Sequence, residues 1–140
     1  MTRFRRRARG WRAAGLAGWM TDMVTGDEVR AFAATLPRAY EAYVRDQVKF
    51  RIGQIVFLAL SPDETLMGFA YPREQREALV AGEPEKFLMP EPRDLRYQWV
   101  RCRLAAIDPA ELRELVVDAW RMCVPKKVWT EYLKTHPLSD

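Results

Sequence analysis

The spacing of apolar residues predicts a helix where the regular part of the chain begins. Val29, Phe32, Ala33 and Leu36 recur at intervals of three and four residues, which is the spacing of one helical face. Residues 25–28, Thr-Gly-Asp-Glu, form a capping-box pattern whose hydroxyl and carboxylate can satisfy free amide groups at a helix start. We therefore expect a helix from residue 25 that ends at Pro37.

From residue 38 to 71 the period shortens to two, which predicts an antiparallel meander. Val48, Phe50 and Ile52 alternate with polar side chains, and Gly53 supplies a turn. Two further apolar runs, 54–60 and 65–71, are separated by the turn cluster 61–64, Ser-Pro-Asp-Glu. A short strand at residues 40–44 can open the meander.

The second half of the chain predicts a helix, a strand and a long helix. The first helix runs from Pro72 to Gly82, and a loop with three prolines follows. In the strand, 96–106, apolar and polar side chains alternate. Residues 108–111, Asp-Pro-Ala-Glu, cap the long helix, which should break at Pro125 before a last turn or two at 128–134. Its predicted inward stripe is Leu112, Leu115, Val116, Ala119 and Cys123.

Composition bounds the chain to one ordinary globular domain with an unusual start. Its 140 residues are 49% hydrophobic and 30% charged. The net charge of +4 is unevenly distributed, because residues 1–24 hold six arginines and one acid. Residues 25–140 then hold 17 basic and 18 acidic side chains, a net charge of −1. A nearly neutral domain has no overall field for nucleic acid, so any such binding requires a local patch.

Residues 1–24 have no hydrophobic period, which predicts a disordered basic leader before a domain at 25–136 and a tail at 137–140. We interpret the leader as an overlong start, with Met20 or Met23 as the initiator. The alternatives are an arm that grips phosphate and a basic aromatic segment that lies on a membrane. The apolar stretch 13–20 is short and broken by glycine, unlike a signal peptide core, and we expect a cytoplasmic protein with no membrane partner.

The C-terminal half resembles a known family. The stretch 97–121, YQWVRCRLAAIDPAELRELVVDAWR, followed by Val-Pro-Lys-Lys at 124–127, resembles the MmcQ/YjbR family. The helix start at residue 25 and the hairpin at 48–57 match the family layout, and the resemblance covers about residues 25–134. It implies an α/β fold of the α+β type, a CyaY-like twisted antiparallel sheet packed on helices. The role that it implies is a double-wing DNA-binding module.

The outward face of strand 96–106 is the candidate nucleic-acid site. Tyr97, Trp99, Arg101 and Arg103 interleave aromatic rings with guanidinium groups, a combination that stacks bases and binds phosphate. Lys49 and Arg51 share the polar parity of a neighbouring strand, and Lys126 and Lys127 follow Pro125, where a helix start can favour an anion. In the competing interpretation the two aromatics pack under loop 83–95 and the arginines pair with Glu91 or Asp94. For the lysine pair, the alternative is a solvated face.

Catalytic and metal sites find little support in the residues. The single histidine, His136, lies in the tail, and no nucleophile or phosphate-loop motif occurs. Glu111 is interpreted as a helix cap and Asp118 as part of a solvated face, while Cys102 and Cys123 should point inward as small apolar residues. We therefore expect no cofactor, no metal and no catalysis. The predicted function is a monomeric DNA-binding module, and the alternative is an adaptor for a protein or a small ligand with no nucleic-acid affinity.

Overall fold

The computed structural model describes residues 24–137, which form six strands and four α-helices around an antiparallel sheet. The helices are α2 (Gly26–Ala33), α3 (Arg73–Gly82), α4 (Pro109–Arg121) and α5 (Lys126–Thr135). The strands are β1 (Tyr40–Val44), β2 (Gln47–Ile52), β3 (Ile55–Leu60), β4 (Leu66–Ala70), β5 (Phe87–Leu88) and β6 (Trp99–Arg103). Two 3-10 turns, η1 (Pro92–Asp94) and η2 (Leu104–Ala106), flank β6.

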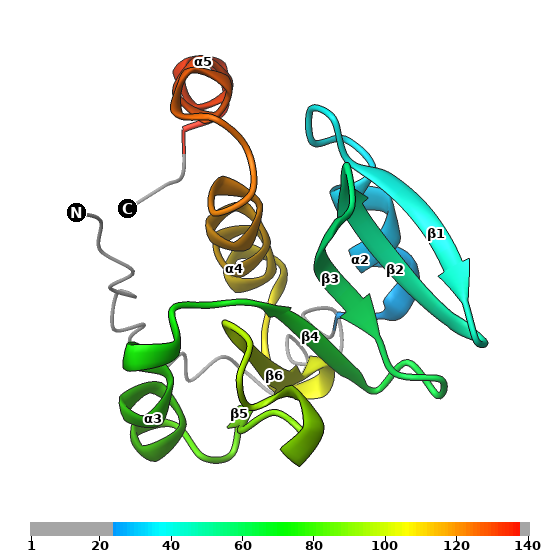
Figure 1. Ribbon diagram of the computed structural model, residues 1–140, viewed down its shortest axis with the longest axis vertical. Coiled ribbons are helices and arrows are strands. Elements are labelled where there is room, and N and C mark those ends of the chain that lie inside the picture. Colours follow the sequence, from blue (N-terminus) through cyan, green and yellow to red (C-terminus); the bar gives the residue numbers. More distant parts are fainter. Residues whose placement is uncertain (1–23, 138–140) are drawn as a thin grey trace, which may run out of the picture.

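The sheet has the order β1-β2-β3-β4-β6-β5, and every pair of neighbours is antiparallel. The first four strands form the predicted meander, and β6 then pairs with β4 (Figure 1). The twisted antiparallel sheet with helices is therefore the predicted fold class. The edge strand β5 was not predicted, because it lies inside the proline-containing segment that was expected to be a loop.

Local signals explain where α2 begins. The Thr25 hydroxyl accepts from the Glu28 amide at 3.2 Å, and the Glu28 carboxylate accepts from the Thr25 amide at 3.0 Å, which is the predicted capping box. The regular helix ends at Ala33, earlier than predicted, and a turn leads on to Pro37.

The hydrophobic core lies on one face of the sheet, beneath α4 and α2. Phe50, Leu58, Phe69 and Val100 are cross-strand partners on four successive strands, and all are buried. A β-bulge next to Phe50 places Phe57 in the core beside Leu58. From the helix side the core is closed by Leu112, Leu115, Val116 and Ala119, as predicted, and by Trp120. The Trp120 indole is fully buried and donates to the Pro37 carbonyl at 2.9 Å.

Three sequence predictions need correction. Strand 96–106 is shorter than expected, because β6 covers Trp99–Arg103 and Tyr97 precedes it. Cys123 lies beyond the end of α4 and is only half-buried. Val24 is 4% exposed in the core, so the ordered domain includes this residue of the predicted leader. Residues 1–23 and 138–140 lie outside the described residues, and the rest of the leader and tail interpretation stays a prediction.

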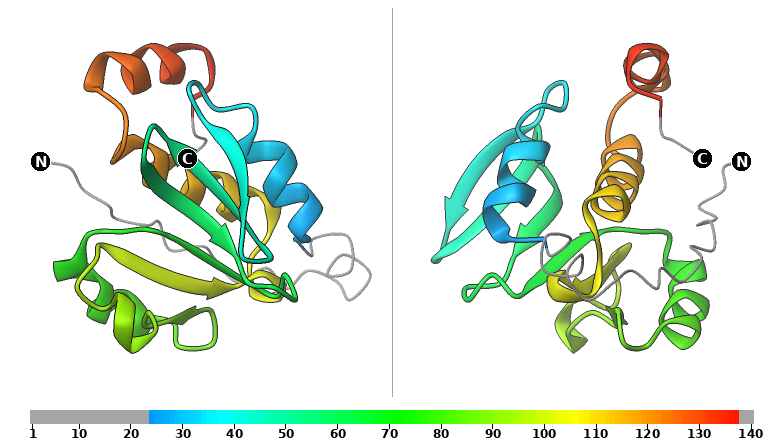
Figure 2. Two further views of the ribbon diagram at one scale, coloured as in Figure 1. Left: turned by 45° about the vertical axis from the view of Figure 1, so that its right-hand side comes forward. Right: turned by 180° about the vertical axis from the view of Figure 1, so that it is seen from behind.

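The two halves of the sheet, β1–β3 and β4–β6–β5, diverge from one another, and α5 lies apart from the strands (Figure 2). A new helix, α5, begins at Lys126 after the predicted break at Pro125. Aromatic contacts fix α5 on α4, with the Arg121 guanidinium 3.9 Å above the Trp129 ring centre and Tyr132 edge-on to Trp120. None of the helices in residues 24–137 is long and apolar enough to span a membrane.

Candidate functional site

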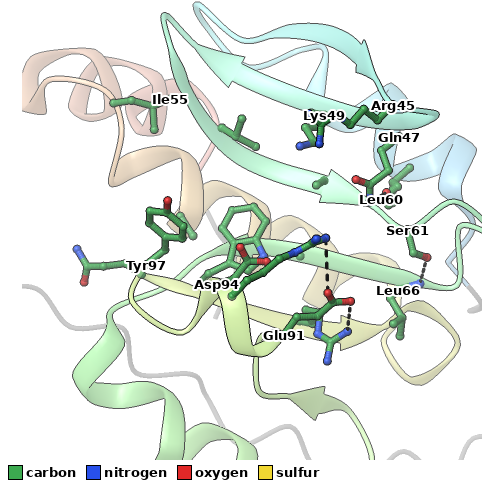
Figure 3. Close-up of a pocket in the computed structure, with 18 of the residues that line it drawn as sticks. Arg45, Gln47, Lys49, Ile55, Leu60, Ser61, Leu66, Glu91, Asp94 and Tyr97 are labelled. Carbon is green, nitrogen blue, oxygen red and sulfur yellow. Dashed lines mark hydrogen bonds and ion pairs between the residues drawn. The ribbon is translucent and has the colours of Figure 1, made fainter.

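A cleft lies between the two halves of the sheet, and its lining includes residues of the sheet face opposite the core. Its volume is about 1240 Å³. Lys49, Ala59, Gly68 and Arg101 are cross-strand partners on β2, β3, β4 and β6, and all four line the cleft. In Figure 3 the β2–β3 side contributes Arg45, Gln47 and Lys49, and the opposite side contributes Glu91, Asp94 and Tyr97. These residues lie on different parts of the chain, and the divergence of the sheet halves places them around one space.

Trp99 lines the cleft with its indole against Gly68 of the neighbouring strand. A Cβ atom on Gly68 would lie 2.7 Å from the indole Nε1 and 2.8 Å from Cζ2, closer than side-chain carbons approach. Only glycine therefore leaves room for the ring in this position. The indole is half-buried, so part of its surface remains available to a ligand.

Tyr97 also lines the cleft and is 50% exposed. Its hydroxyl accepts from the Arg96 guanidinium at 2.7 Å, and the same guanidinium lies 4.8 Å from the ring centre. Both aromatics thus line one cleft, although only Trp99 belongs to the strand.

Arg101 and Arg103 donate to backbone carbonyls on the two sides of β5, Arg101 after this strand and Arg103 before it. The Arg101 Nε and Nη2 donate to the Met89 carbonyl at 3.1 and 2.9 Å, and Nη1 lies 3.9 Å from the Glu91 carboxylate. Arg103 Nη1 donates to the carbonyls of Pro84 and Glu85, each at 3.2 Å. The pairing of Arg101 with Glu91 is the one that the competing interpretation predicts. Both guanidinium groups therefore have donors already in use.

Lys49 and Arg45 present a different electrostatic situation on the opposite wall. Neither side chain forms an ion pair with any of residues 24–137, and Lys49 is half-buried. Arg45 and Asp46 both adopt positive φ, 52° and 64°, in the two-residue turn that joins β1 to β2. This turn fixes Arg45 at the end of the same wall.

The remaining predicted residues do not line the cleft. Arg51 follows Lys49 by two positions on β2, and its Nε is buried without a hydrogen-bond partner among the described residues. Lys126 and Lys127 are exposed at the start of α5. The structure thus brings Lys49, Tyr97, Trp99 and Arg101 together at the cleft and leaves Arg51, Arg103, Lys126 and Lys127 outside its lining.

Sequence reasoning missed several lining residues. Gln47 has the same strand parity as Lys49, which was an available signal, and its side-chain amide donates to the Leu60 carbonyl at 3.2 Å. Gly68 lies between the buried Met67 and Phe69, where an interior glycine signals a close approach. Arg45 and Arg93 are in turns, and their sequence neighbourhood gave no such signal.

Glu111 requires a correction of its predicted role. Its side chain is 2% exposed, and both carboxylate oxygens accept from Lys86 Nζ, at 3.1 and 3.2 Å. The Asp108 side chain accepts from the Glu111 amide at 2.8 Å, so the cap at this helix start is Asp108. Glu111 is therefore one half of a buried ion pair. Asp118 is half-buried and pairs with Arg121 at 3.7 Å.

The described residues offer few groups for proton or metal chemistry. His136 is exposed and stacked on Tyr132, with ring centres 4.2 Å apart. Burial raises the pKa of the Cys123 thiol to about 11, which keeps this cleft residue protonated at neutral pH. Within residues 24–137 no three His, Cys, Asp or Glu side chains lie close enough to hold a metal ion.

Comparison with known proteins identifies the family. No curated protein sequence matches the chain. The crystal structure of the Deinococcus radiodurans protein DR2400, which has a DUF419 domain, superposes with a TM-score of 0.63 at 19% identity, over 84% of this chain and 91% of that one. At this identity the likeness shows a shared fold. The YjbR family model matches residues 34–122, more than half of the sequence, and the chain therefore belongs to the YjbR family.

Proposed function

We propose that this chain is a non-catalytic binding module whose cleft holds an unpaired segment of nucleic acid. The supporting observation is the combination of a half-buried indole, Trp99, with two cations on the opposite wall, Lys49 and Arg45. Proteins that bind single strands use aromatic side chains to stack bases and positive grooves to follow the phosphates. Family membership gives the fold, and the ligand has to be argued from the site.

The ligand is expected to be unpaired because the aromatic groups lie in a concave site. In a duplex, the faces of the bases are covered by their neighbours in the stack, and the indole of Trp99 would find only edges and phosphates. A flexible single strand can place one base against Trp99 while its phosphates reach the wall with Lys49. We assign Tyr97, which is exposed and lines the same cleft, to an adjacent base.

The cations expected to bind phosphate are different from those predicted first. Arg101 and Arg103 already donate to loop carbonyls, so their contribution to a ligand is reduced. Lys49 has no competing carboxylate among the described residues and is held in place by β2. We therefore assign the main phosphate contact to Lys49.

The test compares the binding of labelled oligothymidylate and of a duplex of the same length to the full chain at two salt concentrations. Trp99→Ala should weaken oligothymidylate binding about five- to a hundredfold, the loss of one stacked base, and should affect the duplex less. Lys49→Ala should weaken binding and reduce the slope of log affinity against log salt by about 0.7. Lys134→Ala is the matched control, because Lys134 is exposed on α5 and pairs with Glu131. Equal losses in Lys49→Ala and Lys134→Ala, or no oligothymidylate binding at low salt, would refute the proposal.

One observation favours a second candidate, an adaptor for a neutral small ligand or a protein segment. Four basic side chains line the cleft. Two of them, Arg93 and Arg101, lie 3.6 and 3.9 Å from the Glu91 carboxylate. Much of the remaining lining is apolar, as at Ile55, Val56 and Leu66. Binding to such a ligand would vary little with salt, so the two salt concentrations of the same titration separate the candidates.

A further inference from the structure

Arg76 is a buried arginine on the inner side of α3. The residue is only 5% exposed, and it is the one residue of α3 that is buried. Its Nη1 donates to the carbonyls of Tyr97 and Trp99, at 2.8 and 3.1 Å, and its Nη2 donates to the carbonyl of Leu95. One guanidinium group thus binds three alternate residues of the segment that carries both cleft aromatics.

The same segment is held at its two intervening residues as well. The Arg73 guanidinium donates to the Arg96 carbonyl, and the Tyr71 amide donates to the Gln98 carbonyl at 3.1 Å. All five carbonyls from residue 95 to 99 therefore accept a hydrogen bond from residues 71–76. The start of α3 fixes the backbone of residues 95–99, while Tyr97 and Trp99 line the cleft.

The energetics favour a specific role for the guanidinium group. A buried charge is costly unless polar groups surround it, and Arg76 forms no ion pair with any of residues 24–137. Three carbonyl dipoles take the place of a carboxylate. The planar guanidinium group of arginine holds its N–H donors in a fixed arrangement and can bind three acceptors at once. The ammonium group of lysine is a compact charge at a single nitrogen and cannot span the same three carbonyls.

We infer that Arg76 is a positioning residue, which sets the orientation of Tyr97 and Trp99 in the cleft without contacting the ligand. Without the guanidinium group, the carbonyls of residues 95, 97 and 99 lose this donor, and the backbone of residues 95–99 must shift to find others. Because the indole lies directly against Gly68, a shift of the backbone of residues 95–99 moves Trp99 relative to this glycine. The effect on ligand affinity rests on the proposed function, whereas the effect on the indole does not.

The experiment measures both effects in the full chain. The indole N–H resonance of Trp99 is assigned in a two-dimensional ¹H–¹⁵N spectrum from its loss in Trp99→Phe. In Arg76→Met this resonance should move, while that of Trp120, whose indole binds the Pro37 carbonyl on the far side of the sheet, should stay in place. Oligothymidylate affinity should fall about five- to a hundredfold, as expected when one base loses its stacking partner. Arg113→Met is the matched control, since Arg113 is exposed on α4, and it should leave both readouts unchanged.

The outcomes separate the two proposals. A Trp99 resonance that stays in place in folded Arg76→Met would overturn the inference, whatever the affinity. A resonance that moves while neither the natural sequence nor any variant binds oligothymidylate would support Arg76 as a positioning residue and refute the proposed function. If Arg76→Met does not fold, Arg76→Lys decides by the same resonance, because it keeps the charge and loses the planar guanidinium group. A merely structural role predicts a lower melting temperature with the resonance of Trp99 and the affinity of the folded protein unchanged.

Discussion

At the scale of single residues, the cleft shows that a shared sheet face does not imply a shared electrostatic state. Lys49 and Arg101 are linked through the same row of cross-strand partners, and both line the cleft. Arg101 lies beside the loop that leads into β6, and the Met89 carbonyl and Glu91 take up its donors. Lys49 lies on β2, with β3 and β4 between it and β6, and it forms no ion pair with any of residues 24–137. The positive charge available to a ligand is therefore concentrated on the β2 wall.

Gly68→Ala tests whether the seat of the indole depends on a missing side chain. The added methyl group would lie within 3 Å of three indole atoms, so Trp99 must move, and overpacking of this kind costs about 1–3 kcal/mol. We expect a lower free energy of unfolding in urea and a displaced Trp99 indole resonance. Gly82→Ala is the control, because no atom lies within 4 Å of its Cβ and alanine is favoured in a helix. A Gly68→Ala protein as stable as the control would show that the indole has room elsewhere.

The Cys123 thiol gives a prediction for the pH dependence of stability. Burial raises the pKa of this thiol from 9.0 to about 11 in the folded chain. Between these pH values the unfolded chain loses a proton that the folded chain keeps, so the stability due to this group falls as the pH rises from 9 to 11. Urea unfolding over this range should show a smaller decline for Cys123→Ser than for the natural sequence. An identical decline in both would mean that solvent reaches the thiol freely.

At the scale of secondary structure, periodicity predicted the elements that have one apolar face and missed the contacts that depend on other elements. The stripe from Leu112 to Ala119 and the alternation on β2 are direct consequences of a buried face, so sequence spacing was sufficient. Arg76 occupies the inner side of α3 three and four residues before Leu79 and Val80, but an arginine there looks like a break in the stripe. Its acceptors belong to residues 95–99, and the sequence around Arg76 does not predict a contact with that segment. The role of Glu111 was missed for the same reason, because its partner Lys86 precedes β5, a strand that was expected to be a loop.

The Lys86–Glu111 pair joins α4 to the segment that leads into β5, and its removal tests how these elements are held together. Lys86→Met would leave the Glu111 carboxylate buried without its cation, which costs about 3–5 kcal/mol in buried pairs and less here because Lys86 is 20% exposed. The double variant Lys86→Met, Glu111→Leu should recover part of that loss. The control is Lys134→Met on the exposed Glu131 pair, which should change the free energy of unfolding by about 0.5 kcal/mol or less. If Lys86→Met is as mild as the control, solvent already screens the buried pair.

At the scale of the whole molecule, the net positive charge and the cleft belong to different parts of the chain. Residues 1–24 carry a net charge of +5 and residues 25–140 a net charge of −1. The cleft between the sheet halves is lined by residues 45–123 and belongs to the nearly neutral part. Long-range attraction of a polyanion would therefore come mainly from the leader, whereas stacking and local contact would come from the cleft. The two contributions differ in salt dependence and can be measured separately.

Removal of residues 1–22 separates these contributions. A chain that starts at Met23 keeps the buried Val24, so its melting temperature should match that of the full chain, whereas a cost of about 1 kcal/mol would lower it by several degrees. Its oligothymidylate binding should be weaker at low salt and should depend less steeply on salt, because six arginines are absent. In this shortened chain Trp99→Ala should still weaken binding with little change in slope, and Lys49→Ala should reduce the slope by about 0.7. If the shortened chain folds and binds no oligothymidylate while the full chain does, the nucleic-acid affinity belongs to the leader, and the cleft must serve a different ligand.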